Sequence, residues 1–183
     1  GKRAVDEIPL DQLMGPGVIV DVTEACAADR DHLVTREELL AHEAVHGEIP
    51  EGAIVMLLTG FGRRWPDRTS YMGTETRGAE GVQQLHFPGL HPDAARWLAA
   101  ERRIGAVGLD TPSIDHGPSL EFLSHRALFE ANVPALENGA NLHLLPPRGA
   151  EIVALPMKIR RGSGAPARDQ AGSVCHSAIS RDR

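Results

Sequence analysis

The chain has 183 residues, of which 42% are hydrophobic, and a formal net charge of -6 at pH 7. This length is enough for one domain with a sizeable core of its own. The mild acidity argues against a nucleic-acid-binding protein, which needs clustered lysine and arginine. No apolar run approaches the roughly 20 residues that a membrane helix requires. We therefore expect neither nucleic acid nor a membrane as a partner.

Cysteine use and the first residues bear on the location and completeness of the chain. Cys26 and Cys175 lie far apart and neither belongs to a C-x-x-C pair. This usage predicts no disulfide framework and a reducing, cytoplasmic compartment. The chain opens on Gly1 rather than Met, and no secretory signal is visible. We interpret it as processed, truncated or cut from something longer.

Strand-like and helix-like patterns alternate along the chain. The predicted strands are residues 18–22, 53–59, 104–109 and 151–159, and the predicted helices are residues 35–46, 91–103 and 122–131. Strands that alternate with helices predict an α/β fold. Pro156 interrupts the last strand, which suggests a sheet edge or a bulge at that point.

Two of the helices have well-defined ends in the sequence. Thr35 and Glu38 form a capping box before the first helix, and Gly47 supplies its end. Pro92 is placed for the first turn of the second helix, which is strongly amphipathic. These residues predict where both helices begin.

Two segments show no periodic pattern. Residues 60–84 are expected to form a long loop that contains Trp65 and Tyr71, and loops of this length tend to be functional or disordered. The two rings are candidates to stack on an aromatic substrate, with ordinary partial burial as the alternative interpretation. Residues 162–183 are small and polar, and we expect them to be mostly disordered.

The segment His42-Glu43-Ala44-Val45-His46 matches H-E-x-x-H, the zinc-peptidase signature. On a helix the two histidines lie one turn apart, and Glu43 would activate a water molecule. However, Gly47 ends the helix just after the second histidine, and no third ligand follows in a suitable context. A surface helix with both histidines at its solvent edge is therefore the favoured interpretation.

The stretch from Gly108 to Asn141 is the most informative part of the chain. A strand opens there into Asp110-Thr111-Pro112-Ser113-Ile114-Asp115, a turn of the kind in which scaffolds place chemistry. Capping of backbone donors is the alternative interpretation for each polar residue of this turn. His125 follows near the start of a helix, and Glu137 lies twelve residues further on.

His125 and Glu137 are candidate metal ligands. A neutral imidazole and a carboxylate together suit a divalent metal of borderline character. The neighbours of Glu137 look buried, and a buried carboxylate must be paired or bound to a cation. A lone histidine at a helix start is more often structural, and a catalytic metal generally needs three protein ligands. The two residues alone therefore predict half of a metal site.

Six segments stand in a recognisable order along the chain. They are IPLDQLMGPGVIVDV, IPEGAIVMLLTGF, GLDTPSID, SHRALF, ALENGANL and EIVALPMKIRRGSGAPAR. In this order and spacing they resemble the cyclase-like metal-dependent hydrolases, which include bacterial-type kynurenine formamidases and isatin hydrolases. The resemblance covers roughly Ile8 to Arg168, the C-terminal two-thirds of the family fold. It implies one domain over residues 1–168, followed by a polar, disordered tail over residues 169–183.

The resemblance implies a swivelling β/β/α-type α/β fold, a mixed sheet with flanking helices that usually forms a homo-oligomer. It implies a zinc or manganese centre, with two metal positions in the complete fold, that hydrolyses an amide or lactam C–N bond of a small aromatic substrate. In formamidase-like members a His and a Glu at this separation complete the second metal position. His125 and Glu137 match those places, and a Glu there is nearer to the two-metal formamidase pattern than an uncharged amide.

The chain departs from the family at its start. The principal metal motif of the family, H-x-G-T-H-x-D-x-P-x-H, would precede the IPL segment and does not occur between Gly1 and Glu7. It would bring two His and an Asp to the first metal and a further His for acid–base chemistry. We therefore name no catalytic residue in this chain and predict negligible hydrolase activity for the chain alone.

The function that the resemblance implies is that of an arylformamidase, which converts N-formylkynurenine to kynurenine and formate in tryptophan catabolism. One alternative is a non-catalytic structural or regulatory relative that oligomerises with a full-length subunit. A second alternative is a zinc peptidase that uses His42, Glu43 and His46.

Overall fold

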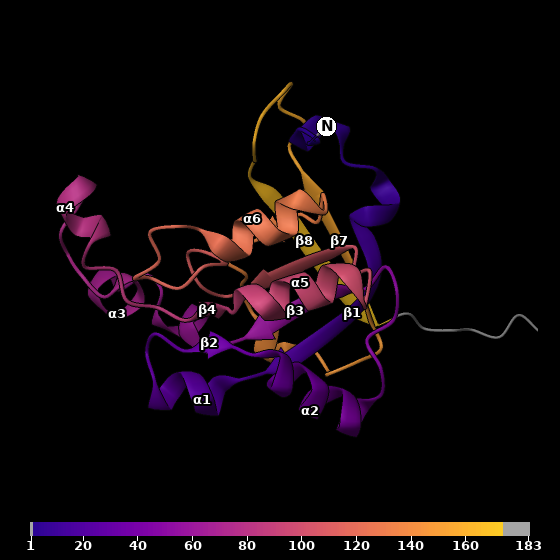
Figure 1. Ribbon diagram of the computed structural model, residues 1–183, viewed down its shortest axis with the longest axis horizontal. Coiled ribbons are helices and arrows are strands. Elements are labelled where there is room, and N and C mark those ends of the chain that lie inside the picture. The colour runs from indigo at the N-terminus through magenta and orange to yellow at the C-terminus, as the bar shows by residue number, and fades with distance from the viewer. Residues whose placement is uncertain (1, 174–183) are drawn as a thin grey trace, which may run out of the picture.

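Six strands form one sheet in the order β6-β5-β3-β1-β7-β8. The computed structural model describes residues 2–173, except for the side chains of residues 168, 169 and 173 (Figure 1). The strands are β1 (Met14–Asp21), β3 (Ile54–Leu58), β5 (Ala106–Leu109), β6 (Ala135–Leu136), β7 (Ala150–Pro156) and β8 (Ala167–Ser173). A separate parallel pair joins β2 (Leu33–Val34) and β4 (Gly89–Leu90).

Helices flank the sheet and connect its strands. The α-helices are α1 (Thr23–Ala28), α2 (Arg36–His46), α3 (Arg68–Met72), α4 (Gly78–Val82), α5 (Pro92–Ala100) and α6 (Leu123–Glu130). Short 3-10 helices are η1 (Val5–Glu7), η2 (Leu10–Gln12), η3 (Phe61–Arg64) and η4 (Leu142–Leu144). Figure 1 shows α5 and α6 in front of the sheet. The predicted α/β class, a mixed sheet with flanking helices, is confirmed.

The direction of the strands decides where functional residues can meet. β1, β3, β5 and β6 are mutually parallel, whereas β7 runs antiparallel to both β1 and β8. Val18 of β1 lies beside Val55 of β3, and Val55 lies beside Val107 of β5. Carboxyl ends of parallel strands meet at one edge of a sheet. Residues that follow β3, β5 and β6 therefore lie together at that edge.

Both faces of the central strands are apolar. Val18 and Val20 belong to the larger core, which also contains residues of α2, α5 and α6, whereas Ile19 belongs to a smaller core with Leu142 of η4. This alternation explains the continuous β-branched run in the sequence, because parallel strands are usually covered on both faces. The strands consequently form a rigid support for the edge that carries the turns.

The helix α2 begins and ends where the sequence predicts. The Thr35 hydroxyl accepts a hydrogen bond from Glu38 N at 3.3 Å, and the Glu38 carboxylate accepts one from Thr35 N at 2.7 Å. Gly47 ends the helix with φ +89°, a region that glycine adopts without steric penalty. The predicted capping box and helix end are therefore confirmed.

The expected long loop over residues 60–84 is wrong in part. This segment contains η3, α3 and α4, and the part with α3 and α4 projects from the body of the molecule (Figure 1). Asp67 caps α3 by accepting a hydrogen bond from Ser70 N at 2.6 Å, and Gly73 ends it with φ +92°. Helices of four or five residues are too short for a 3.6-residue period to appear in the sequence.

The end of the chain also differs from the expectation. Residues 167–173 form β8, which pairs with β7, so the prediction of disorder is wrong there. Backbone hydrogen bonds to a neighbouring strand order this polar segment without an apolar side-chain pattern. The rest of the expected tail, residues 174–183, lies outside the described residues. The proposed domain boundary after Arg168 stays a prediction.

Pro156 is accommodated without an edge strand or a bulge. β7 lies between β1 and β8, so it is not at the sheet edge. Its pairing with β1 stops at Val153, and Pro156 is its last residue, beside Ala167 of β8 alone. The missing N–H of this proline therefore removes no hydrogen bond to β1.

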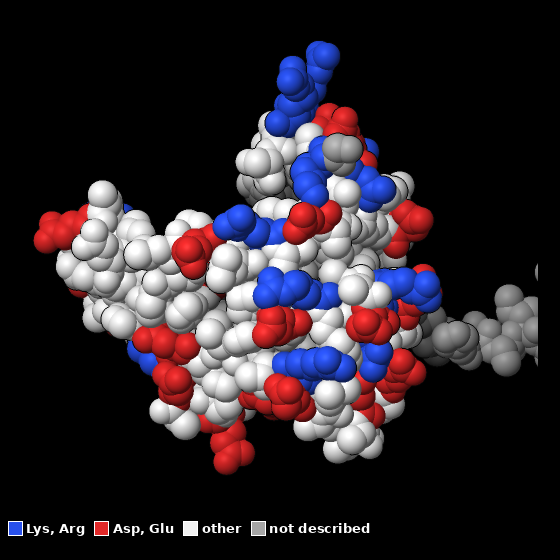
Figure 2. Space-filling model, viewed as in Figure 1, with Lys and Arg blue, Asp and Glu red and all other residues white. Residues whose placement is uncertain are grey.

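Charged side chains are mixed on the face shown in Figure 2. Acidic and basic groups alternate over it, without a broad area of one sign. A groove for nucleic acid would require such an area of positive charge. None of the helices within residues 2–173 combines the length and apolar character of a membrane-spanning segment.

Gly108 is a point of close contact between β5 and β6. A Cβ at this position would lie 2.7 Å from Leu136 Cβ and 2.8 Å from Leu136 O. We predict that Gly108→Ala displaces β6 and lowers the free energy of unfolding by about 1–3 kcal/mol, measured by chemical denaturation. Gly164→Ala is the matched control, because a Cβ there meets nothing within 4 Å. Equal stability of the two variants would contradict this packing.

Candidate functional site

Asp110, the first residue after β5, joins the ends of two parallel strands. Its Oδ1 accepts hydrogen bonds from Thr59 N at 2.8 Å and Thr59 Oγ1 at 2.6 Å. Its Oδ2 accepts from Gly60 N at 3.0 Å and Gly62 N at 3.1 Å. The residue is buried, and four donors replace the water that a carboxylate would otherwise bind. Asp110 thereby holds the turn after β3 against the edge where the site lies.

At the same edge, His125 lies between two carboxylates. Its Nδ1 is 2.6 Å from Asp115 Oδ2, and its Nε2 is 3.0 Å from Glu137 Oε1. His125 is the third residue of α6, and Glu137 directly follows β6. The side chain of Asp115 is 4% exposed, whereas those of His125 and Glu137 are 21% and 31% exposed. The structure thus brings together the two residues that the sequence singles out, with Glu137 less buried than expected.

Asp115 serves both the helix and the histidine. Its Oδ1 accepts a hydrogen bond from Ser124 N at 3.0 Å, and its Oδ2 accepts one from His125 N at 3.1 Å. Phe122, at the N-cap position of α6, provides no side-chain cap, so Asp115 supplies the cap from a distant turn. The same carboxylate contacts His125 Nδ1. This is the usual outer contact of a metal-binding histidine, and it leaves Nε2 as the ligand atom.

The two carboxylates control the charge of the imidazole. Burial lowers the pKa of His125, but the hydrogen bonds to Asp115 and Glu137 outweigh it and raise the pKa to about 9. Burial raises the pKa of Asp115, and the hydrogen bonds from His125 and two backbone amides lower it below its ordinary value. These hydrogen bonds therefore favour the protonated imidazole at neutral pH in the absence of a metal.

The donor atoms fit one part of a divalent-metal site. His125 Nε2 and Glu137 Oε1 converge to 3.0 Å from different elements and both side chains are partly exposed. An imidazole nitrogen and a carboxylate oxygen are ordinary ligands of zinc and manganese, once the imidazole has lost its proton. Among residues 2–173, no group of three or more His, Cys, Asp and Glu side chains is arranged to hold a metal. His125 and Glu137 thus fit as two ligands that other groups would complete.

The structure distinguishes the roles open to Trp65 and Tyr71. Tyr71 is 3% exposed, and its hydroxyl donates to Asn138 Oδ1 at 3.0 Å. Trp65 is 68% exposed and contacts Tyr71 edge-on, with ring centroids 5.7 Å apart. Tyr71 therefore supports the segment that carries Glu137, whereas Trp65 is the ring that a ligand can reach. Stacking of either ring on a substrate stays a prediction.

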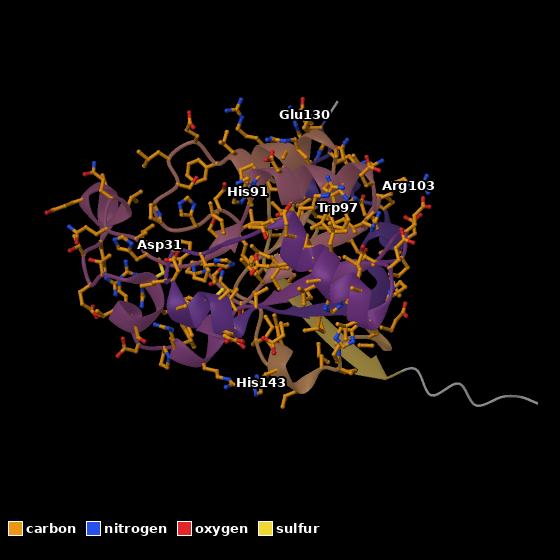
Figure 3. All side chains as sticks on the ribbon, turned by 60° about the horizontal axis from the view of Figure 1, so that its bottom comes forward. Asp31, His91, Trp97, Arg103, Glu130 and His143 are labelled. Carbon is orange, nitrogen blue, oxygen red and sulfur yellow. The ribbon has the colours of Figure 1, made fainter. Side chains whose placement is uncertain are left out.

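The glutamate of the H-E-x-x-H segment is engaged in structural contacts. Glu43 accepts two hydrogen bonds from Arg102, at 2.7 and 2.8 Å, and one from Ile49 N at 2.8 Å. The Arg102 hydrogen bonds are the main reason that the pKa of Glu43 lies below its ordinary value. Arg102 also stacks on Trp97 of α5, with its guanidinium carbon 4.4 Å from the ring centroid. Figure 3 labels Trp97 and Arg103, the residue that follows Arg102. Glu43 therefore joins α2 to the end of α5.

The two histidines of this segment have a cation beside them. The rings of His42 and His46 are 4.6 Å apart, and Arg148 donates to His46 O at 2.8 Å. Burial lowers the pKa of His42, and the charges of His46 and Arg148 lower it further. A neighbouring guanidinium opposes the binding of another cation. His46 is exposed as expected, whereas His42 is half-buried with its Nε2 shielded, so the expected place at the solvent edge is wrong for His42. The geometry still favours the surface helix over the peptidase interpretation.

Replacing Glu43 by glutamine tests this interpretation. We predict that Glu43→Gln lowers the free energy of unfolding by about 1–3 kcal/mol, because charge-assisted hydrogen bonds are lost. The folded-state pKa of Glu43 is lowered, so its contribution is present above the unfolded pKa and disappears as the pH falls through the folded value. Chemical denaturation at about pH 7 and about pH 3 should show the two proteins converging in acid. Unchanged stability with loss of a zinc-dependent peptidase activity would contradict it.

A cavity of about 620 Å³ lies on the face of the sheet opposite α5 and α6. It is lined mainly by apolar and backbone groups of the segment after β6, of η4 and of β7 and β8. No acidic, basic or histidine side chain of the described residues belongs to its lining. It therefore supplies space without reactive groups, and the edge with His125 remains the candidate site.

Asp115 is the site residue that sequence reasoning did not identify as such. Its interpretation as a cap is confirmed, but its contact with His125 joins side chains ten positions apart across an irregular turn. The available signal was indirect: α6 starts after Phe122, which has no capping group. When a helix begins without a capping side chain directly before a candidate ligand, a residue elsewhere in the chain is expected to accept hydrogen bonds from its first N–H groups.

The double role of Asp115 gives a second prediction for this site. Asp115→Ala should lower the free energy of unfolding by about 1–3 kcal/mol and release the His125 ring, seen as a changed imidazole ¹⁵N spectrum. The matched control is Asp93→Ala, which removes a 70% exposed carboxylate at the start of α5. Similar effects of the two substitutions on stability and on the His125 signals would contradict the proposed role.

Fold and site together define an α/β protein with a histidine between two carboxylates at the carboxyl ends of parallel strands. The Cyclase family model matches residues 1–116 of this chain. The chain belongs to this family of cyclase-like hydrolases, which confirms the resemblance drawn from its motifs.

Two relatives show how much of such a protein the chain spans. An isatin hydrolase from Roseibium aggregatum is 33% identical over 167 residues, which cover 89% of this chain and 61% of the relative. A kynurenine formamidase from Salinibacter ruber is 29% identical over 166 residues, which cover 91% of this chain and 66% of the relative. The chain therefore spans less than two thirds of the first relative's length.

Solved structures of similar proteins share the fold. An isatin hydrolase bound to the product analogue thioisatinate aligns with a TM-score of 0.83 and 32% identity, covering 92% of this chain and 63% of that chain. A protein described as a potential metal-dependent hydrolase with cyclase activity aligns with a TM-score of 0.60 and 27% identity. The alignment covers 88% of this chain and 66% of that chain. The expected family fold is therefore confirmed.

Proposed function

We propose that this chain provides the His–Glu metal position of a hydrolase that cleaves a C–N bond in a small aromatic amide. The observation that carries the proposal is the convergence of His125 Nε2 and Glu137 Oε1 to 3.0 Å, with His125 Nδ1 held by Asp115. Membership of the cyclase family supports it, as do relatives named isatin hydrolase and kynurenine formamidase. Because the second ligand is a Glu, the arylformamidase reaction on N-formylkynurenine is the activity we assign.

Each residue of the site has a distinct part in this proposal. His125 and Glu137 would hold a divalent metal, zinc or manganese, and Asp115 keeps the imidazole turned so that Nε2 faces the metal position. A bound divalent metal supplies polarisation of an amide carbonyl and activation of a water molecule. Trp65, exposed next to Tyr71, would contact the aromatic part of the substrate. The proposed setting is a cytoplasmic homo-oligomer.

The chain alone is expected to have negligible hydrolase activity. A catalytic metal generally needs three protein ligands, and His125 and Glu137 provide two. An alternative is a non-catalytic relative that assembles with a full-length subunit. Size-exclusion chromatography with and without such a subunit distinguishes this alternative.

Metal binding at the two ligands is the direct test. We predict that zinc added to the 183-residue chain perturbs the NMR signals of His125 and Glu137 before those of other histidines. His125→Ala and Glu137→Gln should each weaken zinc binding by about tenfold or more, measured by calorimetry. His143→Ala, which removes an exposed histidine of η4, is the control and should leave the affinity unchanged.

One result would contradict the proposal, and a second would contradict the expected inactivity of the chain alone. Zinc affinity that depends on His42 and His46 rather than on His125 would move the metal to α2. Hydrolysis of N-formylkynurenine by the isolated chain with added zinc, at a rate typical of metal-dependent hydrolases, would overturn the expected inactivity.

A further inference from the structure

Two guanidinium groups lie over the ring of Phe61, the first residue of η3. The Cζ atom of Arg64 is 4.1 Å from the centroid of this buried ring, and that of Arg30 is 5.3 Å from it. Like charges repel each other more strongly where burial removes water. Burial lowers the pKa of Arg30, and the charge of Arg64 lowers it further. A negative charge beside this pair would therefore stabilise it.

The two arginines differ in the groups that they bind. Arg30 donates hydrogen bonds to His86 O at 2.8 Å and to Ser70 O at 2.5 Å, and the charge of Asp31 partly offsets its own. Arg64 is half-buried. Among the described residues, ion pairs between arginine and carboxylate involve three other arginines, and Arg64 donates no hydrogen bond. The guanidinium of Arg64 is thus the one of the pair that is open to an anion.

The helix η3 lies against the segment that carries Glu137. Gly62, its second residue, donates a backbone hydrogen bond to Asp110 Oδ2 at 3.1 Å. A Cβ on Gly62 would lie 3.3 Å from Gly139 O, two positions after Glu137. The start of η3 is therefore packed on the edge of the sheet that holds the candidate site.

A second set of contacts joins the end of η3 to the same segment. Trp65, which follows Arg64, contacts the ring of Tyr71 edge-on. The Tyr71 hydroxyl donates to Asn138 Oδ1 at 3.0 Å, directly after Glu137 in the chain. Arg64 thus lies between two parts of η3 and its exit that are both connected to residues 138 and 139.

We propose that Arg64 binds a carboxylate on the amino-acid group of the substrate. The inference rests on the proposed function and narrows its substrate to aromatic amides that carry a carboxylate away from the bond that is cleaved. N-formylkynurenine has such a carboxylate, whereas isatin, an uncharged lactam, has none. A guanidinium can bind a carboxylate through two parallel N–H donors. An ion pair of this kind at Arg64 would also compensate the repulsion between Arg64 and Arg30.

Two compounds that differ in one group provide the probes. N-formylkynurenine carries the carboxylate, whereas N-formylkynurenine amide carries an uncharged carboxamide of nearly equal size at the same position. Because the chain alone is expected to be inactive, the affinity of each can be measured by ligand-observed NMR titration of the 183-residue protein. We expect the wild-type protein to favour the carboxylate, and Arg64→Gln to lose about fivefold to tenfold of that preference. The affinity of Arg64→Gln for the amide should be unchanged, which also shows that the variant is folded.

Arg63→Gln is the matched control for this substitution. It removes an exposed arginine from the same short helix and changes the net charge by the same amount. Its preference for the carboxylate should remain that of the wild-type protein. An equal loss in Arg63→Gln and Arg64→Gln would assign the preference to the general positive field of this region and would overturn the inference.

The remaining outcomes separate the source of the carboxylate and the two proposals. Acetate that displaces N-formylkynurenine from Arg64 at equal concentration assigns the site to free carboxylates and overturns the inference, as does an absence of measurable binding of both compounds. Zinc binding at His125 with an unaltered preference in Arg64→Gln overturns the inference and leaves the proposed function in place. Failure of zinc to bind at His125 and Glu137, with a preference that still depends on Arg64, overturns the proposed function instead.

Discussion

The parallel register of β3, β5 and β6 is the constraint from which the candidate site follows. It brings three strand ends to one edge of the sheet, where Asp110 links the turns after β3 and β5 through four hydrogen bonds. Glu137, directly after β6, lies at the same edge. A carboxylate placed there is held by backbone geometry rather than by a flexible loop, which is what a metal ligand requires.

One side chain at this edge, Asp115, both stabilises a helix and orients a residue of the candidate site. Asp115 caps α6 through Ser124 N and His125 N and also contacts the His125 imidazole. The helix position and the ring orientation are consequently not independent, because the same buried carboxylate determines both. Because Asp115 supplies the cap, the N-cap position itself carries Phe122 instead of a capping residue.

Much of the fold was predictable because its signals are local. The apolar runs of β1, β3 and β5, and the Thr35–Glu38 capping box, each depend on neighbours within a few positions. The short helices between residues 60 and 84 and strand β8 were not predicted, because the former are shorter than two helical turns and the latter is ordered by pairing with β7. A local sequence pattern reveals neither helices this short nor the pairing of one strand with another.

Two residues of the candidate site were predictable, but its geometry was not. His125 and Glu137 were identified from residue type and from the family motifs, whereas the contact between His125 and Asp115 depends on how the turn after β5 folds back onto α6. The same limit applies to Glu43, whose sequence pattern suggested a peptidase and whose hydrogen bond to Arg102, 59 positions away, joins α2 to the turn after α5. Side chains acquire such partners only in the folded chain.

The central claim is that His125 and Glu137 share a divalent metal. Anomalous diffraction from crystals of the 183-residue chain soaked in zinc tests it most directly. The account predicts an anomalous peak between His125 Nε2 and the Glu137 carboxylate, with His125 Nδ1 still bonded to Asp115. A peak beside His42 and His46, or an intact hydrogen bond between His125 and Glu137 in zinc-saturated crystals, would contradict it.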